Sequence, residues 1–221
     1  MALVGNDELR NCFGQLARWQ SARLAWTHRD FLDSERYSQA VRFFLADLYG
    51  DRDYSARDEG LARVSGIMSK VMPTPALESI ADGLEMHAVT QELDRGMVGM
   101  LFDEMGIDGP VDANAYGEAY RRCDNQDGRI RQIVLVAKVG RDLDTIVHKS
   151  SIYHLVRMTH YPAHLAGFGD LQDFIERGFE AFRHMEGADE FLATVTSRER
   201  AVHEAILADA PSTQWAPPES D

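Results

Sequence analysis

Apolar residues recur three or four positions apart along most of the chain, a spacing that places them on one face of a helix. The pattern is clearest between residues 37 and 48, where one stripe contains Tyr37, Val41, Phe44, Leu45 and Leu48. Comparable stripes predict helices over residues 7–28, 55–72, 74–102, 130–147 and 188–209, with shorter ones after Asp112, after Ser150 or Ser151, and from Leu171 to Gly187. The sequence therefore predicts an all-α protein, a single-domain bundle of about eight or nine helices.

Prolines and capping residues set the expected helix ends. Pro73 and Pro75 prevent one helix from continuing into the next, and Thr74 between them is the expected N-cap. Asp112 is expected to cap the short helix that follows it. Pro162 is expected to interrupt or kink the helix in which it lies.

Residues 133–139, IVLVAKV, form the one ambiguous span, because β-branched residues are frequent in strands. The same residues also fit helical spacing, from Ile130 through Ala137 to Val147. No other segment of the chain resembles a strand, so a strand here would have no partner. We therefore expect a helix, with a buried strand as the alternative.

The segment from Arg42 to Asp58, RFFLADLYGDRDYSARD, combines aromatic residues, a turn and several charges between two predicted helices. Gly50 stands where a left-handed helix cap is expected, and Ser55 opens a variant capping box with Asp58. The charges either hold this turn, which is favoured because helix corners commonly use them so, or bind a ligand. Candidate binding residues are Asp47, Tyr49, Asp53, Arg57 and Asp58 in this segment, and Tyr116, Tyr120 and Arg121 on the short helix after Asp112.

This segment also resembles a known family. The run F-F-L-A-D-L-Y-G-D-R-D-Y, residues 43–54, looks like the signature of uncharacterised bacterial all-helical proteins, a domain of unknown function. The resemblance continues through Pro162-Ala163, residues 171–185 and residues 190–194, and so covers most of the chain. It implies a shared helical fold, and it carries no activity, cofactor or site residue onto this chain.

Composition is that of a soluble globular protein, with 44% hydrophobic and 27% charged residues among 221. We expect one helical domain over residues 1–209 and a disordered tail over residues 210–221, which are proline-rich and polar. The net charge of −13 repels phosphate backbones and anionic membranes, and no basic run offsets it. The sequence thus predicts neither a nucleic-acid nor a membrane partner.

Cysteine usage and the N-terminus indicate a cytoplasmic protein. Cys12 and Cys123 are single and distant in sequence, which is typical of reduced thiols rather than of a disulfide framework or a metal site. The first residues, MALVGNDELRN, lack the charged region and the apolar run of a signal peptide.

Histidines provide the best candidate for a metal site. His160 and His164 lie four positions apart, a spacing that puts two imidazoles on one helix face. Pro162 lies between them, however, and the glutamate of the zinc-protease motif is absent. We therefore expect no metal, and keep His154, His160 and His164 as the alternative set.

Other cofactor patterns fit less well. Ferritin-like sites need Glu and His three positions apart, whereas the pairs here are four apart: Glu180 with His184, and Glu199 with His203. A haem would need His154 or His87 as axial ligand, without the Cys-x-x-Cys-His motif. The chain also lacks phosphate-binding loops and the Gly-x-Ser-x-Gly motif, so no cofactor is expected.

Two classes of function remain. The first is a non-catalytic helical interaction or regulatory protein, which binds another protein or itself. The second is a helical bundle with a small-molecule, haem or metal site, either an enzyme or a sensor. The first is favoured because the sequence contains no recognisable catalytic constellation, and for the same reason the chain is not expected to be an enzyme.

Overall fold

The computed structural model describes residues 6–48 and 74–218, and within these ranges every regular element is helical, which confirms the all-α prediction. The elements are α1 (Asn6–Thr27), α2 (Arg29–Leu32), α3 (Ser38–Phe43), the π-helix η1 (Phe44–Leu48), α5 (Thr74–Val98), the π-helix η2 (Gly99–Glu104), α6 (Ala113–Arg122), α7 (Gln126–Val147), α8 (Ser150–Leu165), α9 (Gly169–His184), α10 (Asp189–Leu207) and the 3-10 helix η3 (Ser212–Gln214).

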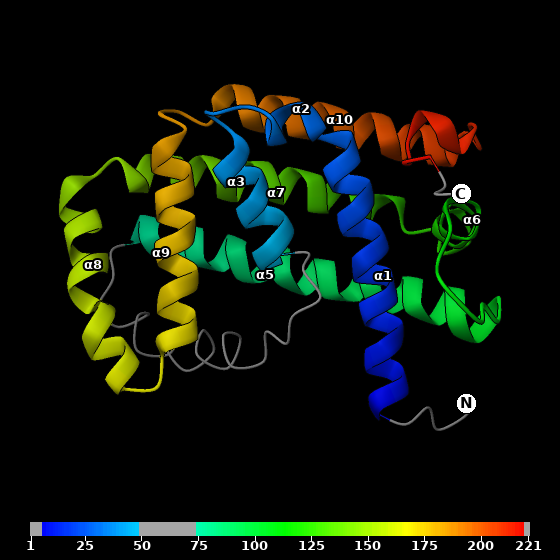
Figure 1. The fold of residues 1–221 in the computed structure, drawn as a ribbon, viewed down its shortest axis with the longest axis horizontal. Coiled ribbons are helices and arrows are strands. Elements are labelled where there is room, and N and C mark those ends of the chain that lie inside the picture. The colour runs from blue at the N-terminus through cyan, green and yellow to red at the C-terminus, as the bar shows by residue number, and fades with distance from the viewer. Residues whose placement is uncertain (1–5, 49–73, 219–221) are drawn as a thin grey trace.

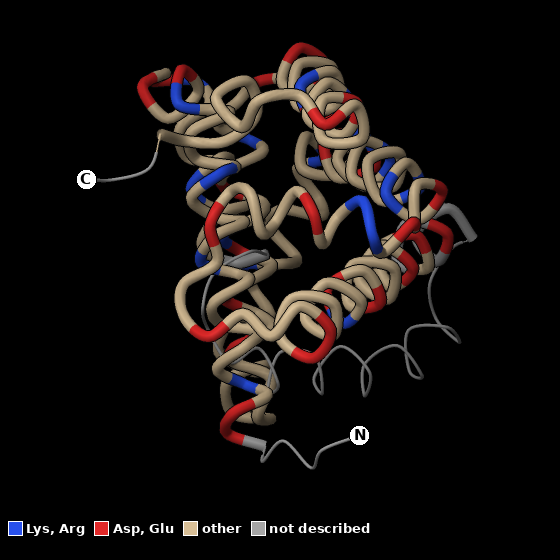
Figure 2. The backbone as a smooth tube through the Cα atoms, turned by 90° about the vertical axis from the view of Figure 1, so that its right-hand side faces the viewer, with Lys and Arg blue, Asp and Glu red and all other residues tan. Residues whose placement is uncertain are grey.

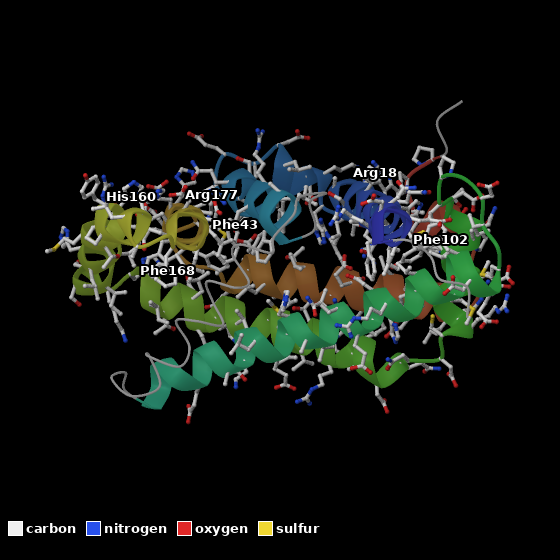
Figure 3. The ribbon with its side chains drawn as sticks, turned by 90° about the horizontal axis from the view of Figure 1, so that it is seen from below. Arg18, Phe43, Phe102, His160, Phe168 and Arg177 are labelled. Atoms are coloured by element: carbon white, nitrogen blue, oxygen red, sulfur yellow. The ribbon has the colours of Figure 1, made fainter. Side chains whose placement is uncertain are left out.

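The helices pack in two layers. The long helices α5, α7 and α10 lie side by side in one layer, with α7 running opposite to the other two, and α1, α3, α8 and α9 cross them in the other layer (Figures 1 and 3). The short helix α6 covers one end of the long helices, where the described C-terminal residues also lie (Figure 1). None of the described helices is long and apolar enough to span a membrane.

Charged residues of both signs are interspersed along the described helices. Figure 2 shows acidic and basic positions on neighbouring parts of the described backbone.

Two apolar cores stabilise the two halves of the bundle. The first lies among α1, α5, α6 and α10, and contains Leu16, Met97, Leu101, Tyr116, Ile206 and Trp215. The second lies among α2, α3, α7, α9 and α10, and is rich in aromatic rings: Phe31, Tyr37, Phe179, Phe182 and Phe191. The predicted stripe from Tyr37 onward faces this second core, where the ring centroid of Phe44 lies 6.0 Å from that of Phe191.

Two expectations about α7 and α8 need correction. Helix α7 covers the whole of residues 133–139, so the strand alternative is wrong, and it begins at Gln126 because the Asn125 side chain accepts a hydrogen bond from Gly128 N at 3.1 Å. Pro162 does not interrupt α8, which continues to Leu165. Proline removes only its own N–H, and its carbonyl still accepts from Ala166 N at 3.0 Å, so the last turn is retained.

The predicted disorder of the tail is wrong for residues 210–218. Trp215 is only 2% exposed and packs against Trp19 of α1 and Tyr116 of α6, with ring centroids 6.2 and 6.4 Å away. Its indole Nε1 donates to the carbonyl of Ala210 at 3.1 Å. One buried aromatic residue thus holds this segment against the bundle, although its polar, proline-rich composition is typical of disorder.

Replacing the anchor should weaken the whole bundle. Trp215→Ala is expected to lower the free energy of unfolding by about 3–5 kcal/mol, because a large buried ring leaves a cavity in the first core. Chemical denaturation measures the difference. Val134→Ala, at a position that is 44% exposed, is the control and should change stability by less than about 0.5 kcal/mol. Equal denaturation midpoints for the two variants would contradict a packed tail.

Candidate functional site

Most of the sequence-predicted binding residues around the first turn cannot be placed. Tyr49, Asp53, Arg57 and Asp58 lie outside the described residues, and of Asp47, which belongs to η1, the structure describes the backbone but not the side chain. Their role in holding the turn or binding a ligand stays a prediction.

Asp112 caps α6 as predicted, since its Oδ1 accepts a hydrogen bond from Ala115 N at 2.7 Å. The candidate binding residues Tyr116, Tyr120 and Arg121 on this helix lie in two different environments. Arg121 turns toward the end of α10, where its guanidinium donates to the Ile206 carbonyl at 3.1 Å and pairs with Asp209 at 3.0 Å. Tyr116 and Tyr120 instead face the interior, and both line a small cavity beside α10.

A buried ion cluster fixes α10 against the corner between α1 and α2. Arg23 Nη1 lies 2.6 Å from both carboxylate oxygens of Glu199, and His28 Nε2 lies 3.2 Å from one of them. Burial alone would raise the pKa of Glu199, but the Arg23 charge and the hydrogen bonds from His28 and Arg23 outweigh it and lower that pKa to about 2. Glu199 is therefore ionised at any physiological pH.

The residue beside Glu199 strengthens the same corner. Arg198 makes a bidentate pair with Asp30 of α2, at 2.6 and 2.7 Å, and donates to the Thr27 carbonyl at 3.1 Å. The hydrogen bonds from Arg198 lower the pKa of Asp30 to about 2. Two consecutive residues of α10 thus hold the end of α1 and the start of α2.

One turn further along α10, His203 meets Tyr120. The hydroxyl of Tyr120 lies 2.8 Å from His203 Nδ1, and His203 is nearly inaccessible to solvent. Burial and the nearby Arg129 charge lower the pKa of His203, and burial raises the pKa of Tyr120. At neutral pH the imidazole is therefore neutral and the phenol keeps its proton, which suits a hydrogen bond from Tyr120 to His203.

Arg129 differs from the other charged residues of this region in its lack of a contacting carboxylate among the described residues. It is 9% exposed, its guanidinium carbon lies 4.6 Å from the Tyr120 ring centroid, and it forms no hydrogen bond or ion pair through its side chain with the described residues. Asp94 lies close enough to interact electrostatically, but burial raises the pKa of Asp94, and its Oδ1 accepts from Gln20 at 3.1 Å instead. The guanidinium thus has an aromatic ring on one side and no contacting carboxylate from the described part of the chain.

A pocket of about 260 Å³ adjoins Arg129 and Tyr120, between α5, α6 and α7. Leu93, Met100 and Leu207 form an apolar wall, and Asn125 and Gln126 contribute amide groups from the start of α7. Behind Tyr120 and Arg129 lies the second cavity, of about 40 Å³, which reaches Glu199 and His203. Tyr120 and Arg129 therefore belong to the walls of both cavities.

Cys123 also lines the pocket, and both cysteines are free thiols, as expected from the sequence. Burial raises the pKa of the Cys123 thiol, against the smaller effects of Arg129 and Arg122. At neutral pH the sulfur is therefore protonated and poorly suited to nucleophilic attack.

A second cluster lies on the surface between α8 and α9. His160 and His164 have ring centroids 4.5 Å apart, and donor atoms of these two residues and Asp173 lie within 4.8 Å of one another. His154, the third member of the alternative metal set, is not part of the cluster among the described residues.

Sequence reasoning missed most of the interior site. It considered Glu199 and His203 only as a di-metal pair and rejected their spacing of four. That spacing was nevertheless the available signal, because it puts both side chains on one face of α10, opposite Arg23 and Tyr120. Nothing in the local sequence distinguishes Arg129 from the many exposed arginines.

Residues 4–213 match the family model of a domain of unknown function, DUF8198. The chain belongs to the DUF8198 family. The resemblance inferred from the FFLADLYG segment is thereby confirmed. Searches of curated proteins and of solved structures found no match, so the interior site of this DUF8198 protein is interpreted from its own geometry.

The Glu199 cluster predicts how stability depends on pH. The carboxylate has a pKa of about 2 in the folded protein against an ordinary value of 4.5, so its contribution is fully present above pH 4.5 and is lost as pH falls toward 2. That contribution is on the order of 3 kcal/mol. Glu199→Gln should be destabilised by about 3–5 kcal/mol at pH 7, because the buried pair with Arg23 is broken, and should approach the parent chain near pH 2.

Denaturant titrations across a pH series measure both chains. Glu204→Gln, on the exposed side of the same helix, is the matched control and should follow the parent curve. If Glu199→Gln and the parent chain lose stability in parallel as pH falls, Glu199 is not the group responsible.

Proposed function

We propose that this DUF8198 protein binds a small organic carboxylate in the pocket between α5, α6 and α7, with Arg129 as the anchor of the anion. The single observation that supports this function is the side chain of Arg129, which is only 9% exposed, lines the pocket, and forms no ion pair or side-chain hydrogen bond with the described residues.

A buried charge without a contacting counter-ion is costly, and folded proteins ordinarily pair or neutralise such groups. Arginine cannot lose its proton at any accessible pH, so neutralisation must come from an anion. Asp94 interacts electrostatically with Arg129, but burial raises the pKa of Asp94, which disfavours the charged form that would neutralise the guanidinium. An anionic ligand in the pocket would supply the missing partner.

The pocket favours a carboxylate among anions. Arg122 and Glu92 also line the pocket, and Arg122 pairs with Glu118 at 3.4 Å, whereas the Arg129 guanidinium can present parallel N–H groups to both oxygens of a carboxylate. Glu92 in the same lining opposes a second negative charge on the ligand, so a monoanion is favoured over a phosphate dianion. The apolar wall of Leu93, Met100 and Leu207 would cover a short hydrocarbon or aromatic body, and a volume of about 260 Å³ admits only a small molecule.

The protonation states around the pocket support binding more than covalent chemistry. Burial leaves Tyr120 and Cys123 protonated, and His203 is neutral and hydrogen-bonded to Tyr120. The protonated Tyr120 and Cys123 are therefore not activated as nucleophiles, and the basic Nδ1 of neutral His203 is already occupied by the Tyr120 hydroxyl. The hydrogen bond to His203 instead holds the Tyr120 ring against which the Arg129 guanidinium lies, as a pre-organised binding site needs.

Ligand titration tests the proposal, with benzoate and butyrate as probes. At least one should bind saturably, and Arg129→Met should weaken that binding at least about 10-fold, since one charge-assisted pair is removed. Calorimetry or ligand-observed NMR measures affinity. Arg121→Met is the matched control: it removes another arginine near α6, should lower stability through its lost contacts to α10, and should leave binding unchanged.

Stability provides an independent readout of the same variants. Arg129→Met should cost no more than about 1–2 kcal/mol of unfolding free energy, because it loses a cation–π contact but also an uncompensated charge. A loss of about 3–5 kcal/mol would show that Arg129 is neutralised within the protein and would overturn the proposal. Failure of both carboxylates to bind, or binding of benzyl alcohol or inorganic phosphate in their place, would overturn it as well.

A second candidate function, self-association, is supported by α8. Leu155, Met158, Tyr161 and Leu165 form one stripe on this helix and are 59, 76, 71 and 72% exposed. Of the long helices that the structure describes, α8 alone has no Asp or Glu. In a chain of net charge −13, an antiparallel α8–α8 contact lets two copies meet without opposing carboxylates, with Leu155 of each against Leu165 of the other.

Sedimentation velocity over a range of concentrations tests this contact. The parent chain should form dimers, and Met158→Glu should leave only monomers, because it places a charge at the centre of the apolar stripe. Val134→Glu, at a 44% exposed apolar position on α7, is the control and should not change the association state. A parent chain that stays monomeric would exclude self-association.

A further inference from the structure

We propose that the surface where α8 packs against α9 is a binding site for a divalent transition-metal ion, with His160, His164 and Asp173 as its protein ligands. The site is separate from the carboxylate pocket and does not depend on the function proposed above.

The two histidines come from one face of α8. They lie four positions apart, so successive turns bring their side chains to the same side, and their ring centroids are 4.5 Å apart. His160 lies at the end of the molecule formed by α8 and α9 (Figure 3). Two imidazoles so close repel one another when both are protonated, whereas a shared metal ion binds both in the neutral form.

Asp173 completes the set from the neighbouring helix. One of its oxygens lies 2.9 Å from His164 Nε2, and donor atoms of His160, His164 and Asp173 lie within 4.8 Å of one another. Ligands around tetrahedral zinc are about 3.3–3.5 Å apart, given bonds of about 2.0–2.2 Å. All three side chains are at least partly exposed, so small rotations suffice to reach that geometry.

Surrounding side chains orient the ring of His160. Its Nδ1 faces the Glu176 carboxylate at 2.9 Å, and Glu176 is itself held by Gln172 Nε2 at 2.8 Å. Gln172 is buried and also donates to the Val156 carbonyl at 2.6 Å, which ties the arrangement back to α8. A carboxylate on one ring nitrogen leaves Nε2 for a metal, the arrangement that commonly orients metal-binding histidines.

Gly169 fixes the ring of His164. A Cβ atom built at position 169 would lie 2.7 Å from His164 Nδ1, so this ring rests directly against the first residue of α9. With Nδ1 turned toward the backbone, Nε2 faces Asp173. Both imidazoles are thus oriented by contacts outside the ligand set, which distinguishes the cluster from a loose pair of surface histidines.

The donor set selects the class of ion. Two imidazoles and one carboxylate suit Zn²⁺ and other first-row transition metals, while Mg²⁺ and Ca²⁺ prefer oxygen ligands throughout. Three protein ligands leave one tetrahedral position for water or another ligand.

Calorimetric titration of the metal-free full chain with ZnCl₂ tests the site. One Zn²⁺ should bind per chain, and MgCl₂ at the same concentration should give no saturable signal. His160→Ala and His164→Ala should each weaken Zn²⁺ binding at least about 10-fold, and Asp173→Asn should do the same without changing the size of the side chain. His154→Ala, on the same helix but outside the cluster, is the matched control and should bind like the parent.

The variants alter exposed positions, and circular dichroism verifies that each keeps its helical content. Loss of binding in both histidine variants but full affinity in Asp173→Asn would indicate a simple two-histidine chelate and overturn the three-ligand site. Equal affinity in the parent and in both histidine variants, or no saturable zinc binding by the parent, would overturn the proposal entirely.

Discussion

The ion pair between Arg23 and Glu199 is the interaction on which the interior of this protein depends. It joins residues 176 positions apart, from helices in different layers, and it shares its carboxylate with His28. A buried pair contributes less to net stability than its short distances suggest, because both charges lose their hydration. Its effect is instead to fix the rotation of α10. With Glu199 locked against α1, His203 one turn later must face α6, where it meets Tyr120.

The same constraint extends from α10 to the pocket. Tyr120 is held by His203 on one side and supports the guanidinium of Arg129 on the other. Since Tyr120 and Arg129 line both cavities, the pocket wall is positioned by contacts that reach back to Arg23. A buried polar group that loses its hydrogen-bond partner destabilises the fold, so each side chain of this network restricts the orientation of the side chains it contacts.

Local patterns in the sequence predicted the helices well, because a stripe of apolar residues and a cap such as Asp112 act within one or two turns. They failed where the structure depends on distant partners. Trp215 lies in a segment whose composition indicates disorder, and it is ordered only because α1 and α6 present Trp19 and Tyr116 to it. The pairing of Glu199 with Arg23 likewise cannot be predicted without knowing the fold. The spacing of Glu199 and His203 predicts only that the two side chains share one face of a helix.

Arg23 and Arg129 show two outcomes for a buried arginine in one protein. Arg23 meets a carboxylate whose pKa is lowered to about 2, so its charge is neutralised inside the bundle and serves the fold. Arg129 is about as deeply buried, yet it faces a pocket and has an aromatic ring in place of a contacting carboxylate among the described residues. Stability alone would favour an apolar residue there. A site that gives up stability is characteristic of function, and this contrast between the two arginines is the reason we propose Arg129, rather than Arg23, as the residue that binds a ligand.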